Sequence, residues 1–385
     1  MQPGLIRRLE LAWRHRLVYP LLRLLLRNES IQLPIDLGGI RSVLILRYDR
    51  LGDMIVTTPV FRALKDRYPR LRVGVFASEL NAPMLRNNPH VDEVYVLFSS
   101  WPRLWTEIMR ARRDGYDLVL NFIFNRTSSA GLLANLIAPH GIKVGQGSEK
   151  YRFYFNALLQ LDRTQEHMAD TLASVLARVT GIQLSPEEVR FDLEPDVESE
   201  QAVAAYLASR DLRPRSGSGP GTPYLVFNVS ATDPVRRISW EQAEKLARHL
   251  ANRRDVRTVV ISSPRDAGAM RAAVTRAGGD MLDVFPGEGN APLMQVAALI
   301  HGALAVVTPD TGIIHFASAM GTPVLGFFTK LQGMHEWLPY GVAHTIVTAD
   351  EGMPTSSIPS TVMTVSVDAF LGRILASSTS GDPQQ

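Results

Sequence analysis

The sequence predicts an α/β fold built from two doubly wound domains. From residue 40 onward, short β-rich runs alternate with longer helical patterns, as in a parallel sheet covered by helices. The alternation restarts after a Pro-, Gly- and Ser-rich segment at 211–223. A chain of 385 residues also exceeds what one hydrophobic core usually serves. We therefore expect two α/β domains around a cleft, with the chemistry at the carboxyl ends of the strands.

The expected division has five parts. These are a basic amphipathic N-terminal arm (1–39), a first Rossmann-like domain (40–210), a flexible connection (211–223), a second Rossmann-like domain (224–365), and a C-terminal helix with a disordered tail (366–385).

The expected elements follow from the apolar pattern. Most strand candidates are continuous apolar runs, which is typical of parallel strands covered on both faces. In the first domain the candidate strands are 43–46, 72–76, 94–97 and 118–122, and the candidate helices include 58–67 and 104–113. In the second domain the strands are 224–229, 258–262, 305–308 and 323–328, and the helices are 240–253, 266–277, 292–301 and 313–320.

The composition is that of a globular protein. Hydrophobic residues make up 45% and charged residues 21%, which argues against global disorder. The absence of cysteine excludes disulfides, thiolate metal sites and a cysteine nucleophile, and it fits a reducing compartment such as the cytoplasm.

The basic charge is concentrated in the N-terminal arm. Six arginines and two glutamates give residues 1–30 a charge of +4, so the rest of the chain sums to −1 and a general nucleic-acid binder is not indicated. Residues 5–27 form an arginine-rich pattern with Trp and Leu, too often interrupted to span a bilayer. Two interpretations remain open: peripheral contact with an anionic membrane leaflet, or packing on the protein or on a second copy.

The first motif, LILRYDRLGDMIVTTP, occupies residues 44–59. A buried strand ends near Arg47, a polar loop follows, and a helix begins near Asp53. Gly52 allows the backbone to approach a ligand closely. The Asp53 carboxylate either faces a substrate hydroxyl or caps the helix by accepting backbone N–H bonds.

The second motif, VVTPDTGIIHFASAMGTP, occupies residues 306–323. A strand runs into Asp310, Thr311 and Gly312, and a short helix follows. The free amides and positive dipole of a helix start suit a diphosphate, with the Thr311 hydroxyl and the Gly312 amide as donors. His315, one turn further on, either contacts a phosphate or ribose or is a hydrogen-bonded core histidine.

The third motif is the first strand–loop–helix of the second domain, residues 227–240, with Arg236 and Arg237 in its loop. Guanidinium groups suit the oxygens of a diphosphate leaving group, although paired loop arginines are often only solvated surface.

Several signatures are absent from the sequence. There is no G-x-G-x-x-G after a strand, no Walker A loop, no H-E-x-x-H and no D-x-D placed as a metal clamp. Dehydrogenase and nucleotide-hydrolase functions lose support, and we expect neither a metal nor a cofactor.

With these motifs in this order, the chain over residues 41–345 resembles glycosyltransferase family 9, the ADP-heptose:lipopolysaccharide heptosyltransferases. Residues 47–59 look like the family's strand and Leu-Gly-Asp loop, and 309–323 look like its Asp-Thr-Gly-x-x-His nucleotide site. Residues 337–341 fit the family as well. Arg236–Ser239 stands where the family commonly has Lys-Arg-Trp-Pro, and 121–126, ending at Arg126, stands where it has an acceptor-side Asp-x-x-Gly-Leu.

The resemblance implies a GT-B fold and an inverting, metal-independent transfer of a sugar, heptose in this family, from a nucleotide-sugar to a lipopolysaccharide core at the inner face of the cytoplasmic membrane. It makes Asp53 the catalytic base and Asp310, Thr311, Gly312 and His315 donor-binding residues. Arg236 and Arg237 join the donor side, and Arg47, Gly52 and Arg126 the acceptor side or its loop. The alternatives are another sugar-nucleotide enzyme of the same fold, such as a 2-epimerase, and a catalytically silent membrane-surface module.

Overall fold

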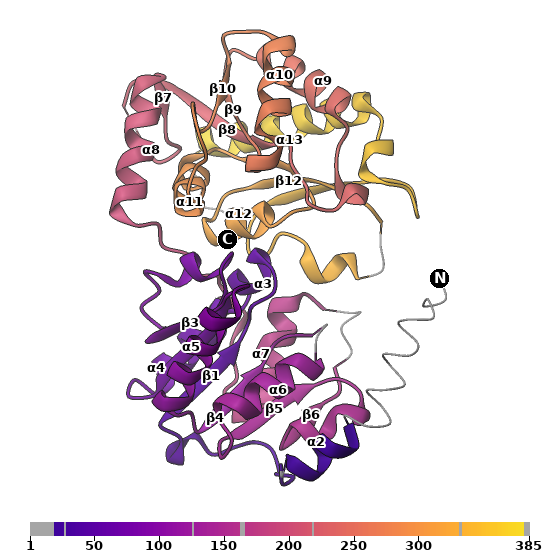
Figure 1. Cartoon of the computed structure of the whole chain (residues 1–385). Coiled ribbons are helices and arrows are strands. Elements are labelled where there is room, and N and C mark those ends of the chain that lie inside the picture. The colour runs from indigo at the N-terminus through magenta and orange to yellow at the C-terminus, as the bar shows by residue number, and fades with distance from the viewer. Residues whose placement is uncertain are drawn as a thin grey trace.

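The structure, a computed structural model, describes residues 19–26, 28–124, 127–161, 166–217, 219–330 and 333–380. Two parallel sheets form the centres of two domains, one above the other in Figure 1. The predicted fold class, α/β with two Rossmann-like domains, is therefore confirmed. Residues 1–18 and 27 of the predicted N-terminal arm lie outside the described residues, as does Arg126.

The first sheet has the order β3-β2-β1-β4-β5-β6 with every pair parallel. Its strands are β1 (Ser42–Leu46), β2 (Arg72–Ser78), β3 (Glu93–Leu97), β4 (Leu118–Asn121), β5 (Ile142–Gln146) and β6 (Ala157–Leu159). All five residues of β1 are buried, as expected for the central strand of a sheet covered on both faces.

The helices of the first domain cover both faces of this sheet. α5 (Trp101–Asp114) and α6 (Thr127–Ile137) pack on one face, and α4 (Thr58–Arg67) and α7 (Met168–Thr180) on the other. The short α3 (Leu51–Ile55) follows β1, and α2 (Tyr19–Leu25) packs at the edge, where the Tyr19 hydroxyl lies 3.1 Å from the Ser128 hydroxyl.

The second sheet repeats the same winding, with the order β10-β9-β8-β11-β12-β13. Its strands are β8 (Thr222–Asn228), β9 (Arg257–Ile261), β10 (Leu282–Val284), β11 (Val306–Pro309), β12 (Val324–Phe328) and β13 (His344–Thr348), and the two-residue β7 (Leu212–Arg213) pairs with β8. α9 (Trp240–Ala251) and α13 (Ser360–Ser380) cover one face with α10 (Ala267–Ala277); α8 (Val197–Ser209), α11 (Leu293–Gly302) and α12 (Ile313–Ala319) cover the other.

The domain boundary differs from the sequence prediction. Helix α8, within the range assigned to the first domain, packs on α11, and its Tyr206 hydroxyl donates to the Val284 carbonyl at 3.0 Å. Residues 211–223 therefore join α8 to β8 inside the second domain. Their Pro-, Gly- and Ser-rich composition carries no information about which sheet the preceding helix covers.

One apolar cluster continues through both domains. Buried side chains of β1, α4 and α7 belong to the same cluster as those of β8, α11 and α12.

Among the described residues no helix has the length and apolar character needed to cross a bilayer.

Candidate active site

In each sheet the strand order reverses at one point, between β1 and β4 in the first sheet and between β8 and β11 in the second. The three motifs lie at these two points. The first follows β1 beside β4, the third follows β8, and the second follows β11 beside β8. Ligands of doubly wound sheets bind outside the carboxyl ends of the strands at such switch points. The motifs meet where α3 of the first domain packs on α12 of the second (Figure 1).

Arg47 organises the first motif. Its side chain is fully buried, and its Nε donates to the Asp53 carbonyl at 2.8 Å while Nη2 donates to Asp53 Oδ1 at 3.1 Å. Nη1 donates to Asp49 Oδ2 at 3.2 Å and also to the Phe122 carbonyl. A guanidinium held on four sides fixes the position of the carboxylates around it.

Asp53 makes a capping contact, which is one of the two roles weighed from its sequence position. Its Oδ2 accepts from the Arg50 amide at 3.2 Å at the start of α3, which is a capping contact. Asp53 as a whole is 8% exposed, so its carboxylate is largely desolvated but still reaches the surface. Each oxygen keeps lone-pair capacity for one further hydrogen bond, which is what a proton acceptor needs.

Asp49 is a functional candidate that the motif reading missed. Burial raises the pKa of its carboxyl to about 6, with Arg47 opposing the shift and Asp53 adding to it. Its Oδ1 is buried and has no hydrogen-bond partner among the described residues. The available signal was its position in the same loop as Asp53, two residues after Arg47.

The second motif joins the third through an ion pair. Arg236 Nη1 lies 3.0 Å from Asp310 Oδ2, so loops after β8 and β11 are linked by charge. Burial raises the pKa of Asp310, and Arg236 opposes this. Asn228 Nδ2 donates to the Thr311 hydroxyl at 3.2 Å and to the Thr308 hydroxyl at 2.9 Å, which fixes Thr311 at the mouth of the loop.

The two loop arginines have different environments. Arg237 donates from Nε and Nη2 to the Ala231 carbonyl at 3.2 and 3.0 Å and lies 3.5 Å from Asp266. These contacts brace the loop itself. Arg236 is the arginine that the structure brings next to Asp310 and Thr311.

His315 lies at the contact between the domains. Its ring is buried, and burial, with a smaller contribution from His167, lowers its pKa to about 3, so the ring is neutral. A Cβ added to Gly52 would lie 2.3 Å from His315 Cδ2, and a Cβ added to Gly312 would lie 3.6 Å from Leu51 Cβ. Glycine at 52 is thus required by the approach of α3 to α12, which brings the two most specific motifs together.

An aromatic group beside His315 completes the domain contact. His167, at the start of α7, has its Nε2 3.1 Å from the Leu338 carbonyl, and burial lowers its pKa to about 4. The Tyr340 hydroxyl donates to Asp170 Oδ1 at 2.5 Å. Residues 337–341 therefore connect the second domain to α7 of the first.

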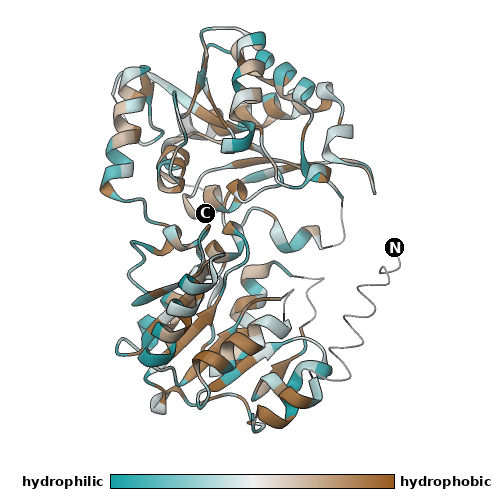
Figure 2. Cartoon of the chain, in the orientation of Figure 1, coloured by the Kyte–Doolittle hydropathy of each residue, from teal (hydrophilic) through white to brown (hydrophobic). Residues whose placement is uncertain are grey.

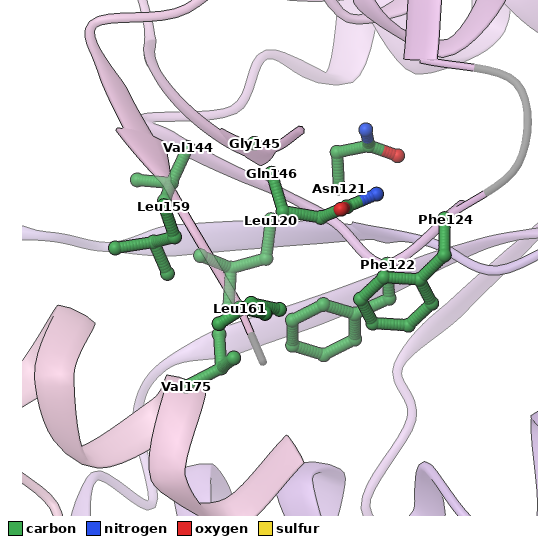
Figure 3. A pocket seen from close by; sticks show the side chains of 10 residues that line it. All are labelled: Leu120, Asn121, Phe122, Phe124, Val144, Gly145, Gln146, Leu159, Leu161 and Val175. Atoms are coloured by element: carbon green, nitrogen blue, oxygen red, sulfur yellow. The ribbon is translucent and has the colours of Figure 1, made fainter. Parts of the chain in front are cut away.

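The first domain contains a small pocket at the carboxyl ends of β4 and β5 (Figure 3). The rings of Phe122 and Phe124 line it beside the amides of Asn121 and Gln146. Gln146 Nε2 donates to the Ile123 carbonyl at 3.2 Å, and Asn121 Oδ1 accepts from the Ile123 amide at 3.0 Å. Arg47 lies 5.5 Å from the centre of the Phe124 ring, so this pocket adjoins the Asp53 loop.

No cluster of three or more histidine, aspartate or glutamate side chains suited to a metal occurs in the parts of the chain that the structure describes. In those parts the cation paired with Asp310 is the guanidinium of Arg236.

Known proteins resemble this chain along most of its length. The sequence profile of glycosyltransferase family 9 (heptosyltransferase) matches residues 104–365. Lipopolysaccharide heptosyltransferase 3 of Escherichia coli is 23% identical over 352 residues, which cover 86% of this chain and 98% of that relative.

Solved structures share the arrangement of the two domains. The family 9 glycosyltransferase of Veillonella parvula is 20% identical, with a TM-score of 0.74 over 89% of this chain and 100% of its own. The E. coli ADP-heptose lipopolysaccharide heptosyltransferase II is 19% identical, with a TM-score of 0.67 over 86% and 99%. The GT-B architecture implied by the family resemblance is thereby confirmed. Because the family profile covers more than half of the chain, the protein belongs to glycosyltransferase family 9 and is a glycosyltransferase.

Proposed function

We propose that the protein transfers a heptose from ADP-heptose to a lipopolysaccharide core or similar glycolipid, with inversion at the anomeric carbon and without a metal. The observation that carries this proposal is the packing of α3, which contains Asp53, on α12, whose preceding loop holds Asp310 in an ion pair with Arg236. A relative named lipopolysaccharide heptosyltransferase and a structural neighbour named for ADP-heptose support the choice of acceptor and donor.

In the proposed reaction an acceptor hydroxyl attacks the anomeric carbon while Asp53 takes the hydroxyl proton. The bond between the anomeric carbon and the diphosphate oxygen breaks, and the nucleoside diphosphate leaves on the opposite face, so the configuration inverts. Arg236 and the polar start of α12 stabilise the developing phosphate charge. Asp310 holds Arg236 in position, and residues 337–341 maintain the alignment of the domains.

A glycolipid acceptor places the enzyme at a membrane. We propose that it works at the cytoplasmic face of the cytoplasmic membrane, where the arginine-rich residues 5–27 favour anionic lipid. The described part of the arm, α2, packs on the first domain through Tyr19, whose ring lies 5.6 Å from that of Phe153.

The test measures release of nucleoside diphosphate from ADP-heptose in the presence of a heptose-deficient lipopolysaccharide core. We expect ADP release that depends on the acceptor, and no release from GDP-, UDP- or CDP-sugars at equal concentration. Product formed without any acceptor would instead indicate an epimerase. A protein that binds the core but never releases ADP would indicate a silent module.

A further inference from the structure

Helices α2, α5 and α6 expose large apolar side chains on one side of the first domain. We name their outward surface the α2–α5–α6 face; its exposed apolar residues are Leu21, Leu24, Leu25, Trp101, Trp105, Met109 and Leu132. Trp101 and Trp105 are 66% and 44% exposed, and their rings stack at 6.0 Å. α6 packs between α5 and the segment that carries α2 (Figure 1), and it is the most hydrophobic of the three in Figure 2.

The charged side chains of α5 differ in their partners. The acidic side chains are engaged within the domain, since Glu107 accepts from the Val96 amide at 3.0 Å and Asp114 accepts from the Tyr95 hydroxyl at 2.6 Å. Arg103, Arg112 and Arg113 are exposed; Arg103 lies 3.6 Å from the centre of the Phe98 ring and 4.0 Å from Glu79, and Arg112 donates to the Leu136 carbonyl at 2.7 Å. A helix with exposed indole rings and exposed arginines suits the boundary of an anionic bilayer, where aromatic rings sit at headgroup level and arginines reach phosphates.

We propose that the α2–α5–α6 face docks on an anionic lipid bilayer, with Trp101, Trp105 and the α2 leucines inserted among the headgroups. The need for a membrane rests on the proposed glycolipid acceptor, but the docking itself requires neither donor nor acceptor. In this proposal the folded domain contacts the lipid through this face, in addition to any contact made by the N-terminal arm.

The test is co-sedimentation of the full chain with vesicles of phosphatidylethanolamine and phosphatidylglycerol, compared with phosphatidylcholine alone. We expect binding to the anionic vesicles and at least a tenfold weaker partition for Trp101→Ser/Trp105→Ser. The matched control is Val362→Ser/Val365→Ser, which changes two exposed valines on α13 of the other domain and should bind as the unaltered chain does.

Three outcomes would overturn this docking. The first is equal binding by the tryptophan variant and the unaltered chain. The second is binding lost only when Arg7, Arg8, Arg14 and Arg16 are replaced, which would assign the contact to the arm. The third is a dimer in lipid-free buffer that the tryptophan variant dissociates, which would assign the face to a second copy. Circular dichroism confirms that each variant is folded.

A second inference concerns Asp49 and is independent of the first. Arg47 carries one positive charge and has two carboxylate partners, at 3.2 Å in Asp49 and 3.1 Å in Asp53. If Arg47 paired with Asp53 only, its positive charge would stabilise the ionised form of Asp53 and so oppose the uptake of a proton. A second carboxylate on the same guanidinium offsets that attraction.

We infer that Asp49 is a positioning residue that shares Arg47 with Asp53 and so keeps Asp53 able to accept a proton. The charged groups facing Asp49 are Arg47, Arg50 and Asp53. Across the domain contact Arg50 also acts on Asp310, which is paired with Arg236, and the nearby His315 ring is neutral. This inference rests on Asp53 being the base of the proposed transfer.

The test compares pH profiles of kcat for the unaltered enzyme, Asp49→Asn and Asp49→Glu. With the pKa of Asp49 at about 6, protonation removes its charge as pH falls, so kcat of the unaltered enzyme should fall through pH 6. In Asp49→Asn we expect kcat at pH 8 to be about tenfold lower, with no limb near pH 6 and donor KM within about twofold. Asp49→Glu should restore both kcat and the limb in part.

A merely structural Asp49 would give a different pattern. Then Asp49→Asn would melt at a lower temperature yet keep the kcat and the pH limb of the unaltered enzyme, and the inference would be wrong. A change in donor KM with unchanged kcat would contradict it equally. If the unaltered enzyme releases no ADP from any donor, the failure lies with the proposed function and not with Asp49.

Discussion

Asp53→Asn is expected to lower kcat for sugar transfer by about 10²–10⁴-fold, the usual contribution of a positioned general base. Asparagine is nearly isosteric with aspartate, and its single amide oxygen can keep one of the two contacts, with Arg47 or with the Arg50 amide. It cannot take up the proton of an attacking hydroxyl. Because Asp53 lies in the first domain and Arg236 and Thr311 in the second, donor affinity should change little.

The measurement is acceptor-dependent ADP release together with the donor-induced rise in melting temperature. Asp66→Asn, on the exposed side of α4, is the matched control and should keep full turnover. Loss of the thermal shift along with turnover would mean that the variant disturbs the fold around the buried Arg47. Full turnover by Asp53→Asn would remove Asp53 from the role of base.

The parts of the site that depend on local sequence could be predicted. A continuous apolar strand followed by a polar loop fixes where a side chain leaves the sheet, so Arg47 and Asp310 were placed at strand ends correctly, and Asp53 near the start of the next helix. The repeated alternation predicted both sheets, and the same winding in each explains why the motifs occupy equivalent switch points.

Contacts between segments far apart in the chain could not be predicted from the sequence. The approach of Gly52 to His315 joins positions on different domains, and no local pattern encodes it. Asp49 was missed because its importance depends on a guanidinium being buried under the loop. Arg236 and Arg237 are adjacent in the chain, and only their tertiary partners, Asp310 and Asp266, distinguish them.

Gly52→Ala is expected to destabilise the domain interface, because the added methyl group meets His315. The Cβ of Gly52→Ala would lie 2.3 Å from His315 Cδ2 and 3.0 Å from Nε2, so α3 and α12 must separate or the ring must move within a packed cluster. Overpacking of this kind destabilises by about 1–3 kcal/mol. Any separation also displaces Asp53 from the donor side, and we expect kcat to fall with the melting temperature.

A double-mutant cycle isolates the steric cause of this effect. His315→Ala removes the ring that the new methyl group would meet, so Gly52→Ala should cost much less in the His315→Ala background than in the unaltered chain. Gly268→Ala is the control, because no atom lies within 4 Å of its Cβ position and alanine favours α10. Melting temperatures by calorimetry measure all four members of the cycle. Additive effects of the two substitutions would show that the ring does not limit residue 52, and that the two domains approach each other through other contacts, such as the Tyr340–Asp170 hydrogen bond.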